Sequence, residues 1–164
     1  MSTAIDEAIK FELEGVTLYT DLQTKAQDIL TKKLFESLVA QEKMHLEYIT
    51  NFSQSRKFEP LRYNPLENSI QKVFESISQE SAKKEKISQA EGYELALKLE
   101  DKGYHLYQKA LAEASEEEDK KFFKFLSQME QEHYEALANV YYYLTENDKW
   151  LAENESITWS WMNL

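Results

Sequence analysis

The sequence predicts an all-α protein, an antiparallel four-helix bundle whose two helical pairs are joined by one long crossover. Only three glycines and two prolines interrupt 164 residues that are otherwise rich in alanine, leucine, glutamate, lysine and glutamine, which are strong helix formers. Apolar side chains recur at helical spacing in four long segments. The two halves of the chain also repeat one another, which favours a bundle built from a duplicated helical hairpin.

Four amphipathic segments are expected to form the helices of the bundle. They cover residues 3–28, 32–55, about 88–114 and 118–145. A short polar turn at 28–31 separates the first two, and another at 116–119 separates the last two. Because these turns are short, the two helices of each pair are expected to be antiparallel.

The segment between the pairs, about residues 55–86, contains both prolines and is predicted to be the crossover. A shorter amphipathic stretch within it predicts a small helix of its own, with apolar positions at Ile70, Val73, Phe74 and Ile77. A helix of about 26 residues is roughly 39 Å long. A connection of about 30 residues can therefore travel the length of the bundle and start the second pair at the same end as the first.

The internal repeat is the strongest organisational signal. Residues 8–47 align without gaps to residues 96–135, and fourteen of these 40 positions are identical. The identical pairs include Glu12/Glu100, Gly15/Gly103, Tyr19/Tyr107, Glu42/Glu130 and His45/His133. Two copies of one hairpin are expected to pack around a pseudo-twofold axis, where equivalent side chains can meet and form a symmetric site.

Composition limits the partners and the compartment that we expect. With 30 acidic and 19 basic residues, the formal charge of −11 disfavours nucleic acid and anionic membrane surfaces as partners. The absence of cysteine excludes disulfides, zinc–thiolate sites and iron–sulfur centres from the sequence. No basic segment followed by an apolar run opens the chain, and no apolar stretch is long enough to span a membrane. We expect a cytoplasmic protein.

Six side chains form a pattern typical of a two-metal site. Glu42 and His45 lie three residues apart on one predicted helix face, and Glu130 and His133 repeat that spacing. The first and third helices each place one glutamate in an apolar stripe. The predicted ligands are therefore Glu12, Glu42, His45, Glu100, Glu130 and His133. A single Glu-x-x-His would carry little weight in a glutamate-rich chain, but the repetition of the whole set does.

Charge balance indicates two divalent ions. Four carboxylates inside a small bundle repel one another unless they are protonated or matched by cations, and two divalent ions supply the opposite charge. Mixed carboxylate and imidazole ligands favour iron, with manganese or zinc as substitutes, over calcium. Oxidation of two ferrous ions to ferric would leave excess positive charge, which a bridging oxide would balance.

Three further features lie near the predicted site, and the first two have two interpretations each. Tyr19 and Tyr107 lie two helical turns beyond Glu12 and Glu100, so their hydroxyls either orient a ligand carboxylate or only pack in the core. The glycines at positions 15 and 103 either open a path for a small oxidant or permit close helix packing. His105 aligns with a threonine and has no glutamate three residues before it, so we interpret it as a non-ligand.

At these residues the sequence resembles the rubrerythrin family of the ferritin-like di-iron carboxylate superfamily. Residues 8–19 (AIKFELEGVTLY) and 96–107 (ALKLEDKGYHLY) resemble its first and third helices, and 35–45 and 123–133 resemble its second and fourth. The resemblance covers residues 3–145 and implies a ferritin-like fold, a di-iron site, homodimers, and either peroxide reduction or dioxygen-dependent oxidation of ferrous iron.

Two departures from the family pattern bear on function. Rubrerythrins usually carry an added glutamate on the third helix at the position of Gly103, and they commonly carry a cysteine-rich rubredoxin domain that this sequence lacks. The electrons are therefore expected to come from an external donor protein, rubredoxin-like or similar.

The sequence divides into a predicted bundle, residues 1–146, and an aromatic tail, residues 147–164. Apolar side chains are dense in the tail: Trp150, Ile157, Trp159, Trp161 and Met162. So much apolar surface is expected to be buried, either against one end of the bundle or, as we favour, against a second subunit.

The leading functional hypothesis is a di-iron oxidoreductase that reduces hydrogen peroxide, or oxygen, and acts in oxidative stress. One alternative is oxidation and storage of ferrous iron. The other is a non-enzymatic bundle with a relic metal site. Whether iron turns over with stoichiometric peroxide or accumulates beyond two atoms per chain distinguishes the first two hypotheses.

Overall fold

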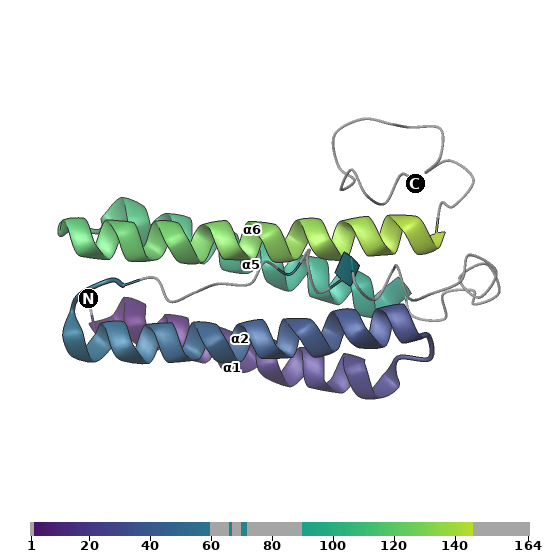
Figure 1. Ribbon diagram of the computed structural model, residues 1–164. Coiled ribbons are helices and arrows are strands. Elements are labelled where there is room, and N and C mark those ends of the chain that lie inside the picture. The colour runs from purple at the N-terminus through teal and green to yellow at the C-terminus, as the bar shows by residue number, and fades with distance from the viewer. Residues whose placement is uncertain (1, 60–65, 67–69, 72–89, 146–164) are drawn as a thin grey trace.

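The computed structural model describes residues 2–59, 66, 70–71 and 90–145. Within these residues the chain forms four long α-helices that lie side by side (Figure 1). They are α1 (Ser2–Lys25), α2 (Ile29–Ser55), α5 (Ala90–Glu113) and α6 (Glu117–Thr145). The predicted all-α bundle is confirmed. The aromatic tail lies outside the described residues, so its packing and the homodimer stay predictions.

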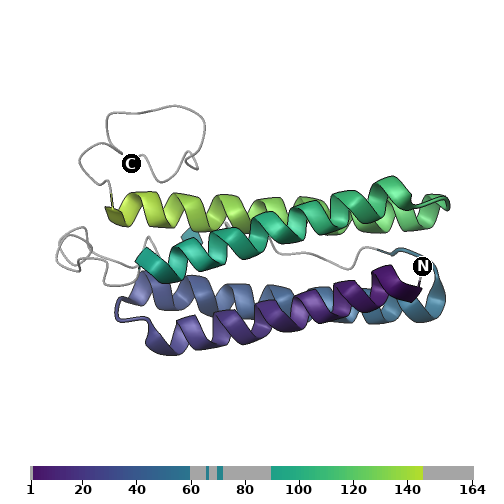
Figure 2. The ribbon, with the colours of Figure 1, turned by 180° about the vertical axis from the view of Figure 1, so that it is seen from behind.

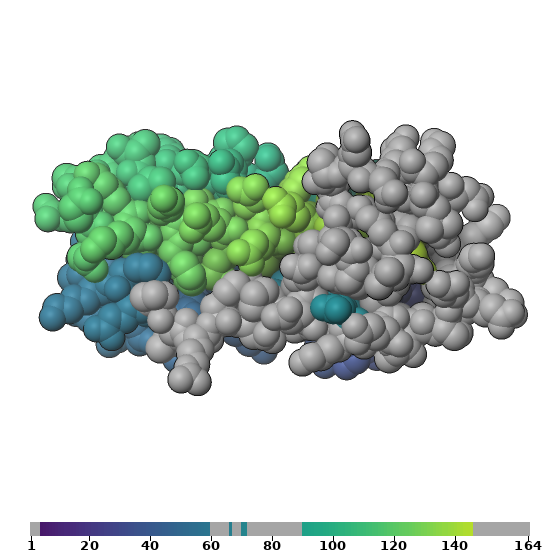
Figure 3. Space-filling view, turned by 45° about the horizontal axis from the view of Figure 1, so that its top comes forward, coloured from purple at the N-terminus to yellow at the C-terminus, as the bar shows by residue number. Residues whose placement is uncertain are grey.

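The directions of the helices confirm the long crossover. Helices α1 and α2 form one antiparallel hairpin and α5 and α6 form the other, with the most extensive packing inside each hairpin. The view from behind shows that α2 and α5 run in the same direction (Figure 2). The chain must therefore return along the length of the bundle between them, and α6 packs directly against α2 on the face seen in Figure 3.

Local capping explains where α1 ends and α2 begins and ends. The Asp28 carboxylate accepts a hydrogen bond from the Thr31 N–H at 2.6 Å and caps the start of α2. Helix α1 therefore ends at Lys25, three residues before the predicted end. At the other end of α2, Arg56 has a left-handed backbone with φ of 55°, and its N–H donates to the Phe52 carbonyl.

An ion pair attaches the end of α2 to the start of α6. The Arg56 guanidinium lies 2.7 Å from the buried Asp119 carboxylate. Next to it, the Phe58 N–H donates to the Glu118 carboxylate at 3.1 Å. Glu118 and Asp119, at the start of α6, therefore connect this helix to the residues that follow α2.

The core consists of two apolar clusters, one toward each end of the bundle. One contains Tyr19, Leu34, Phe35, Leu38, Tyr93, Leu137 and Val140, together with Leu66 and Ile70 from the crossover. The other contains Ile5, Ala8, Phe11, Ile49, Phe52, Tyr107, Phe122 and Leu126. Along every helix, the predicted metal ligands lie between residues of the two clusters. Burial of each large apolar side chain contributes roughly 1.5–3 kcal/mol, which helps to offset the cost of burying that polar layer.

The crossover contributes to the core at two described positions. Leu66 and Ile70 are fully buried in the first cluster, as expected for the amphipathic stretch that begins at Ile70. The other three apolar positions of that stretch, Val73, Phe74 and Ile77, lie outside the described residues. None of the helices in the described part of the chain has the length and apolarity that a membrane span needs.

Candidate metal centre

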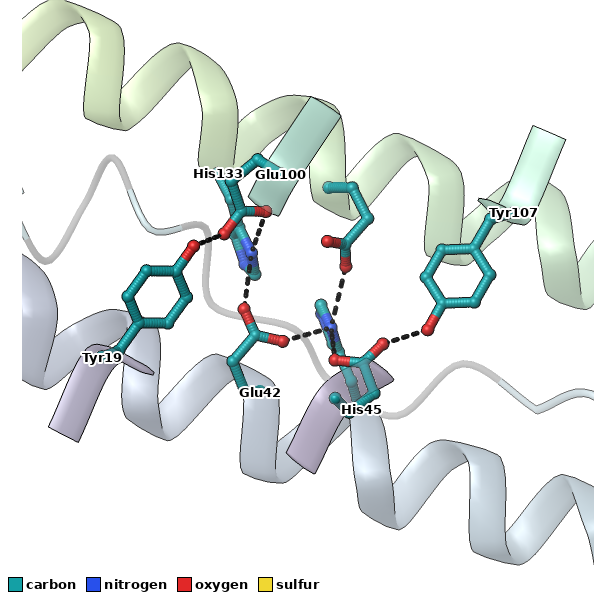
Figure 4. A network of polar contacts seen from close by, with 8 residues as sticks. Tyr19, Glu42, His45, Glu100, Tyr107 and His133 are labelled. Carbon is teal, nitrogen blue, oxygen red and sulfur yellow. Dashed lines mark hydrogen bonds and ion pairs between the residues drawn. The ribbon is translucent and has the colours of Figure 1, made fainter. Parts of the chain in front are cut away.

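The structure brings all six predicted ligands together in the middle of the bundle. Glu12 comes from α1 and Glu100 from α5, while α2 and α6 each contribute a glutamate and a histidine. Each of the six side chains is at most 2% exposed. The i, i+3 spacing directs each Glu–His pair inward on one helix face, and Figure 4 shows the side chains converging from all four helices.

The six residues form two overlapping groups with metal-binding geometry. One group is Glu12, Glu42, His45 and Glu130, and the other is Glu42, Glu100, Glu130 and His133. Within each group, the potential ligand atoms all lie within 4.8 Å of one another. Because Glu42 and Glu130 belong to both groups, the arrangement can accommodate two ions that share two carboxylates.

Both imidazoles direct the Nδ1 nitrogen toward carboxylates. His45 Nδ1 lies 3.1 Å from Glu12 Oε2, 3.3 Å from Glu42 Oε2 and 3.2 Å from Glu130 Oε1. His133 Nδ1 lies 3.3 Å from Glu42 Oε1 and 3.4 Å from Glu100 Oε2. The two rings are stacked, with centroids 5.0 Å apart and planes at 7°. The two His–Glu sets are thus close to symmetric.

Unsatisfied buried atoms show that the site fits divalent ions. Both oxygens of Glu130, Oε2 of Glu42 and Oε2 of Glu100 are buried and have no hydrogen bond. A buried carboxylate without a partner is costly, and four carboxylates crowded together repel one another. Two cations would satisfy the oxygens and balance the charge, and carboxylate with imidazole is a ligand set suited to iron.

Without metal, the site retains protons. Burial, and then the neighbouring Glu100, raise the pKa of Glu130 well above its usual value. Burial raises the pKa of Glu12 to about 8. Burial alone would lower the pKa of His133, but the charges of the adjacent Glu100 and Glu42 carboxylates raise it to about 10. Metal ions would have to displace these protons, so metal binding is linked to pH.

Two residues of the site have pKa shifts set by competing causes. Burial alone would raise the pKa of Glu42, but its close polar contacts with Glu12, His133 and His45 hold it well below its usual value. For His45, burial would lower the pKa, but the charge of Glu12 raises it well above the usual value. Glu42, which belongs to both groups, is therefore more readily ionised before metal binds than Glu12 or Glu130.

The two predicted tyrosines hold ligand carboxylates across the hairpin interface. The Tyr19 hydroxyl on α1 donates to Glu100 Oε1 on α5, and the Tyr107 hydroxyl on α5 donates to Glu12 Oε1 on α1 (Figure 4). Both phenols are fully buried, and burial with the nearby carboxylates raises their pKa well above the usual value. They therefore keep their protons and remain donors, as the orienting interpretation requires.

The two glycines give the shared glutamates room. A Cβ added at Gly15 would lie 3.2 Å from Glu42 Cγ and Cδ. A Cβ added at Gly103 would lie 2.5 Å from Glu130 Oε2 and 2.6 Å from the ring of Phe11. Because side chains fill the space beside both glycines, the structure supports close packing over an open path at these positions.

The sequence reasoning missed the role of Phe11. Its ring occupies the space beside Gly103, meets Tyr107 edge-on at 6.1 Å between centroids, and has the Lys102 ammonium 5.5 Å from its own centroid. A signal was available, because Phe11 directly precedes Glu12 and its repeat equivalent is the smaller Leu99. His105, by contrast, is exposed, and its Nδ1 lies 2.8 Å from the Asp101 carbonyl.

Comparison with known proteins identifies one family. A family model described as rubrerythrin matches residues 4–141, a range that includes all six predicted metal ligands. Neither the search of curated proteins nor that of solved structures gives a significant match.

Proposed function

The chain belongs to the rubrerythrin family, and we propose that it holds two iron ions and reduces hydrogen peroxide with electrons from an external donor protein. The observation that carries this proposal is the pair of overlapping ligand groups that share Glu42 and Glu130. An external donor follows from the absence of cysteine, which leaves the sequence without an iron–sulfur or rubredoxin-type centre of its own.

Each residue of the cluster has a distinct role in this proposal. Glu12 and His45 would hold one ion, Glu100 and His133 the other, and Glu42 and Glu130 both. Two ferrous ions side by side would supply the two electrons that, with two protons, convert one hydrogen peroxide to two water molecules. The four carboxylates would match the charge of the reduced pair while both imidazoles are neutral.

The surrounding side chains support this chemistry by position and by exclusion of water. The two apolar clusters lie on either side of the site along the bundle, which keeps the carboxylates in a low-dielectric interior. The phenols of Tyr19 and Tyr107 donate to the outer ligands Glu100 and Glu12 and fix their orientation. Neither phenol is placed as a proton-abstracting base, because each already donates its proton to a carboxylate.

One observation favours a second candidate function, the oxidation and storage of ferrous iron. Glycine stands at position 103, where the family resemblance implies an added glutamate, and the ring of Phe11 fills the adjacent space. With glycine at this position, the predicted ligand set consists of the six residues that the internal repeat relates in pairs. This departure weakens the peroxide assignment more than it weakens the assignment of the metal.

Metal analysis followed by rapid mixing tests the proposal. Protein purified without added metal should contain about two iron ions per chain. After anaerobic reduction, it should consume about one hydrogen peroxide per iron pair, faster than it reacts with oxygen, with a rise in near-ultraviolet absorption. Faster reaction with oxygen, release of peroxide, or accumulation of more iron would replace this proposal with storage. No response to either oxidant would refute the catalytic role.

A further inference from the structure

A cavity on the outer side of the second hairpin lies beside one residue of the candidate metal centre. Its volume is about 220 Å³ and it lies between α5 and α6. It is lined by Glu100, Asp101, Tyr104, Gln131 and Tyr134. Four of these residues are exposed or half-buried, whereas Glu100 is 1% exposed and is one of the six residues of the site. The cavity is therefore open to the surface and has one residue of the candidate metal centre in its wall.

The contact with Glu100 places the cavity beside one metal position rather than both. Glu100 belongs only to the group that contains His133, and its Oε2 lies 3.4 Å from His133 Nδ1 without a hydrogen bond. Its other oxygen accepts the hydrogen bond from Tyr19. A molecule in the cavity would thus lie beside Glu100, the glutamate that belongs to this group alone.

The internal repeat shows that the cavity lining is specific to the second hairpin. The three predicted ligands of the second hairpin have identical residues 88 positions earlier. All four outer lining residues, by contrast, differ from their equivalents. The pairs are Asp101/Leu13, Tyr104/Val16, Gln131/Lys43 and Tyr134/Leu46. The first hairpin thus has three aliphatic side chains and one lysine where the second has two phenols, an amide and a carboxylate.

The size and chemistry of the cavity suit a small uncharged molecule that forms hydrogen bonds. Its volume is several times the roughly 30 Å³ that one water occupies in the liquid, yet below the roughly 300–1,000 Å³ of pockets for drug-sized ligands. Tyr104 and Tyr134 contribute aromatic side chains with phenol groups to its lining, and Gln131 contributes an amide whose nitrogen donates to Glu135. Asp101 and Glu100 disfavour anions.

We propose that this cavity is the access port through which hydrogen peroxide reaches the metal position of Glu100 and His133. This inference rests on the proposed function, because it assumes a loaded site that reacts with peroxide. It goes beyond that function by naming one face of the bundle, and one of two nearly symmetric metal positions, as the side that receives the oxidant.

A matched pair of substitutions tests the port. Gln131→Trp adds bulk at the lip of the cavity, and Lys43→Trp adds the same bulk at the equivalent exposed position of the first hairpin. In the anaerobically reduced, iron-loaded protein, Gln131→Trp should slow the reaction with hydrogen peroxide by about tenfold, a rise of about 1.4 kcal/mol in the barrier. Lys43→Trp should leave the rate unchanged.

Two further readouts separate failure of the port from failure of the proposed function. Nitric oxide, a small uncharged probe, should bind the reduced protein more slowly in Gln131→Trp, as followed by its absorption, while iron content stays at the wild-type value. Tyr134→Ala should enlarge the opening and accelerate both reactions, relative to Leu46→Ala as its control. A wild-type protein without iron refutes the proposed function. Equal rates in the matched variants of an iron-loaded, reactive protein refute the port alone.

Discussion

The first hairpin, α1 and α2, and the second, α5 and α6, are alike inside and different outside. Inside, both carry the same glutamates, histidine, glycine and tyrosine at equivalent positions. Outside, the residues beside these positions differ, and a cavity that has Glu100 in its wall lies on the second hairpin. Interior residues are constrained because each hairpin completes the other's ligand group, whereas surface residues contact mainly solvent and can diverge.

One interior difference breaks the symmetry. Phe11 of the first hairpin is equivalent to Leu99 of the second, and only the larger ring reaches the glycine of the opposite hairpin. The space beside Gly103 is therefore much tighter than the space beside Gly15. The two halves thus share a ligand set but differ in how tightly it is packed and in how it is reached.

The largest expected effect is on metal content, and it distinguishes ligands that belong to both groups from ligands that belong to one. Glu42→Ala or Glu130→Ala removes a residue from both groups and should reduce metal content from about two ions per chain to almost none. Glu12→Ala or Glu100→Ala affects one group and should leave about one ion. Elemental analysis of the purified variants measures this, with the exposed Glu47→Ala and Glu132→Ala as controls. The ligand assignment is wrong if the controls lose as much metal as Glu42→Ala.

Substitution of alanine for each of the two glycines should change the free energy of unfolding by different amounts. Gly103→Ala would force its Cβ against Glu130 and the Phe11 ring, and overpacking of this kind costs roughly 1–3 kcal/mol in free energy of unfolding. At Gly15 the closest contact is 3.2 Å, and the better helix propensity of alanine, worth about 1 kcal/mol, should offset it. Urea unfolding of the metal-free variants gives both values, and equal losses would contradict the packing asymmetry.

Removal of the tyrosine hydroxyls should weaken opposite metal positions. Because Tyr19 holds Glu100, Tyr19→Phe should weaken the position of His133, and Tyr107→Phe should weaken the position of His45 through Glu12. Loss of such an orienting hydrogen bond typically costs about 10- to 100-fold in metal affinity. Stepwise titration with cobalt(II), followed by absorption, should show one weakened step in each variant. Unchanged binding in both would leave the tyrosines a packing role only.

The smallest expected effect is on the pH dependence of the metal-free protein. The pKa values of Glu12, Glu130, His45 and His133 are raised in the folded state, so the folded state binds more protons than the unfolded state. Stability is then lost as pH rises through these raised values. The lowered pKa of Glu42 acts in the opposite direction but only in acid, below its usual value of 4.5.

Melting temperatures measured with a chelator present should therefore fall between pH 4.5, the usual pKa of Glu12, and about pH 10, the raised pKa of His133. Glu12→Gln should flatten the fall, because glutamine keeps the shape of the neutral carboxyl group but cannot ionise. A melting temperature that rises over this range would show that the cluster does not retain protons in the folded state.

Sequence reasoning succeeded where the signal was local or repeated. Apolar spacing located the four helices to within a few residues, and the repeated Glu-x-x-His indicated which six side chains would converge. It could not foresee that Tyr19 holds Glu100 and not Glu12, because that depends on how one hairpin packs on the other. The packing of Phe11 beside Gly103 and the α5–α6 cavity likewise depend on side-chain shapes across an interface.

The crossed contacts at the centre have a mechanical consequence for the protein. Each ligand group takes three residues from one hairpin and one from the other, and each tyrosine donates across the same boundary. Each bound ion would therefore act as a reversible cross-link between two halves that the chain joins only through residues 56–89. Docking of the hairpins and binding of metal would therefore be thermodynamically linked, so removal of the metal by a chelator would weaken the packing of one hairpin against the other.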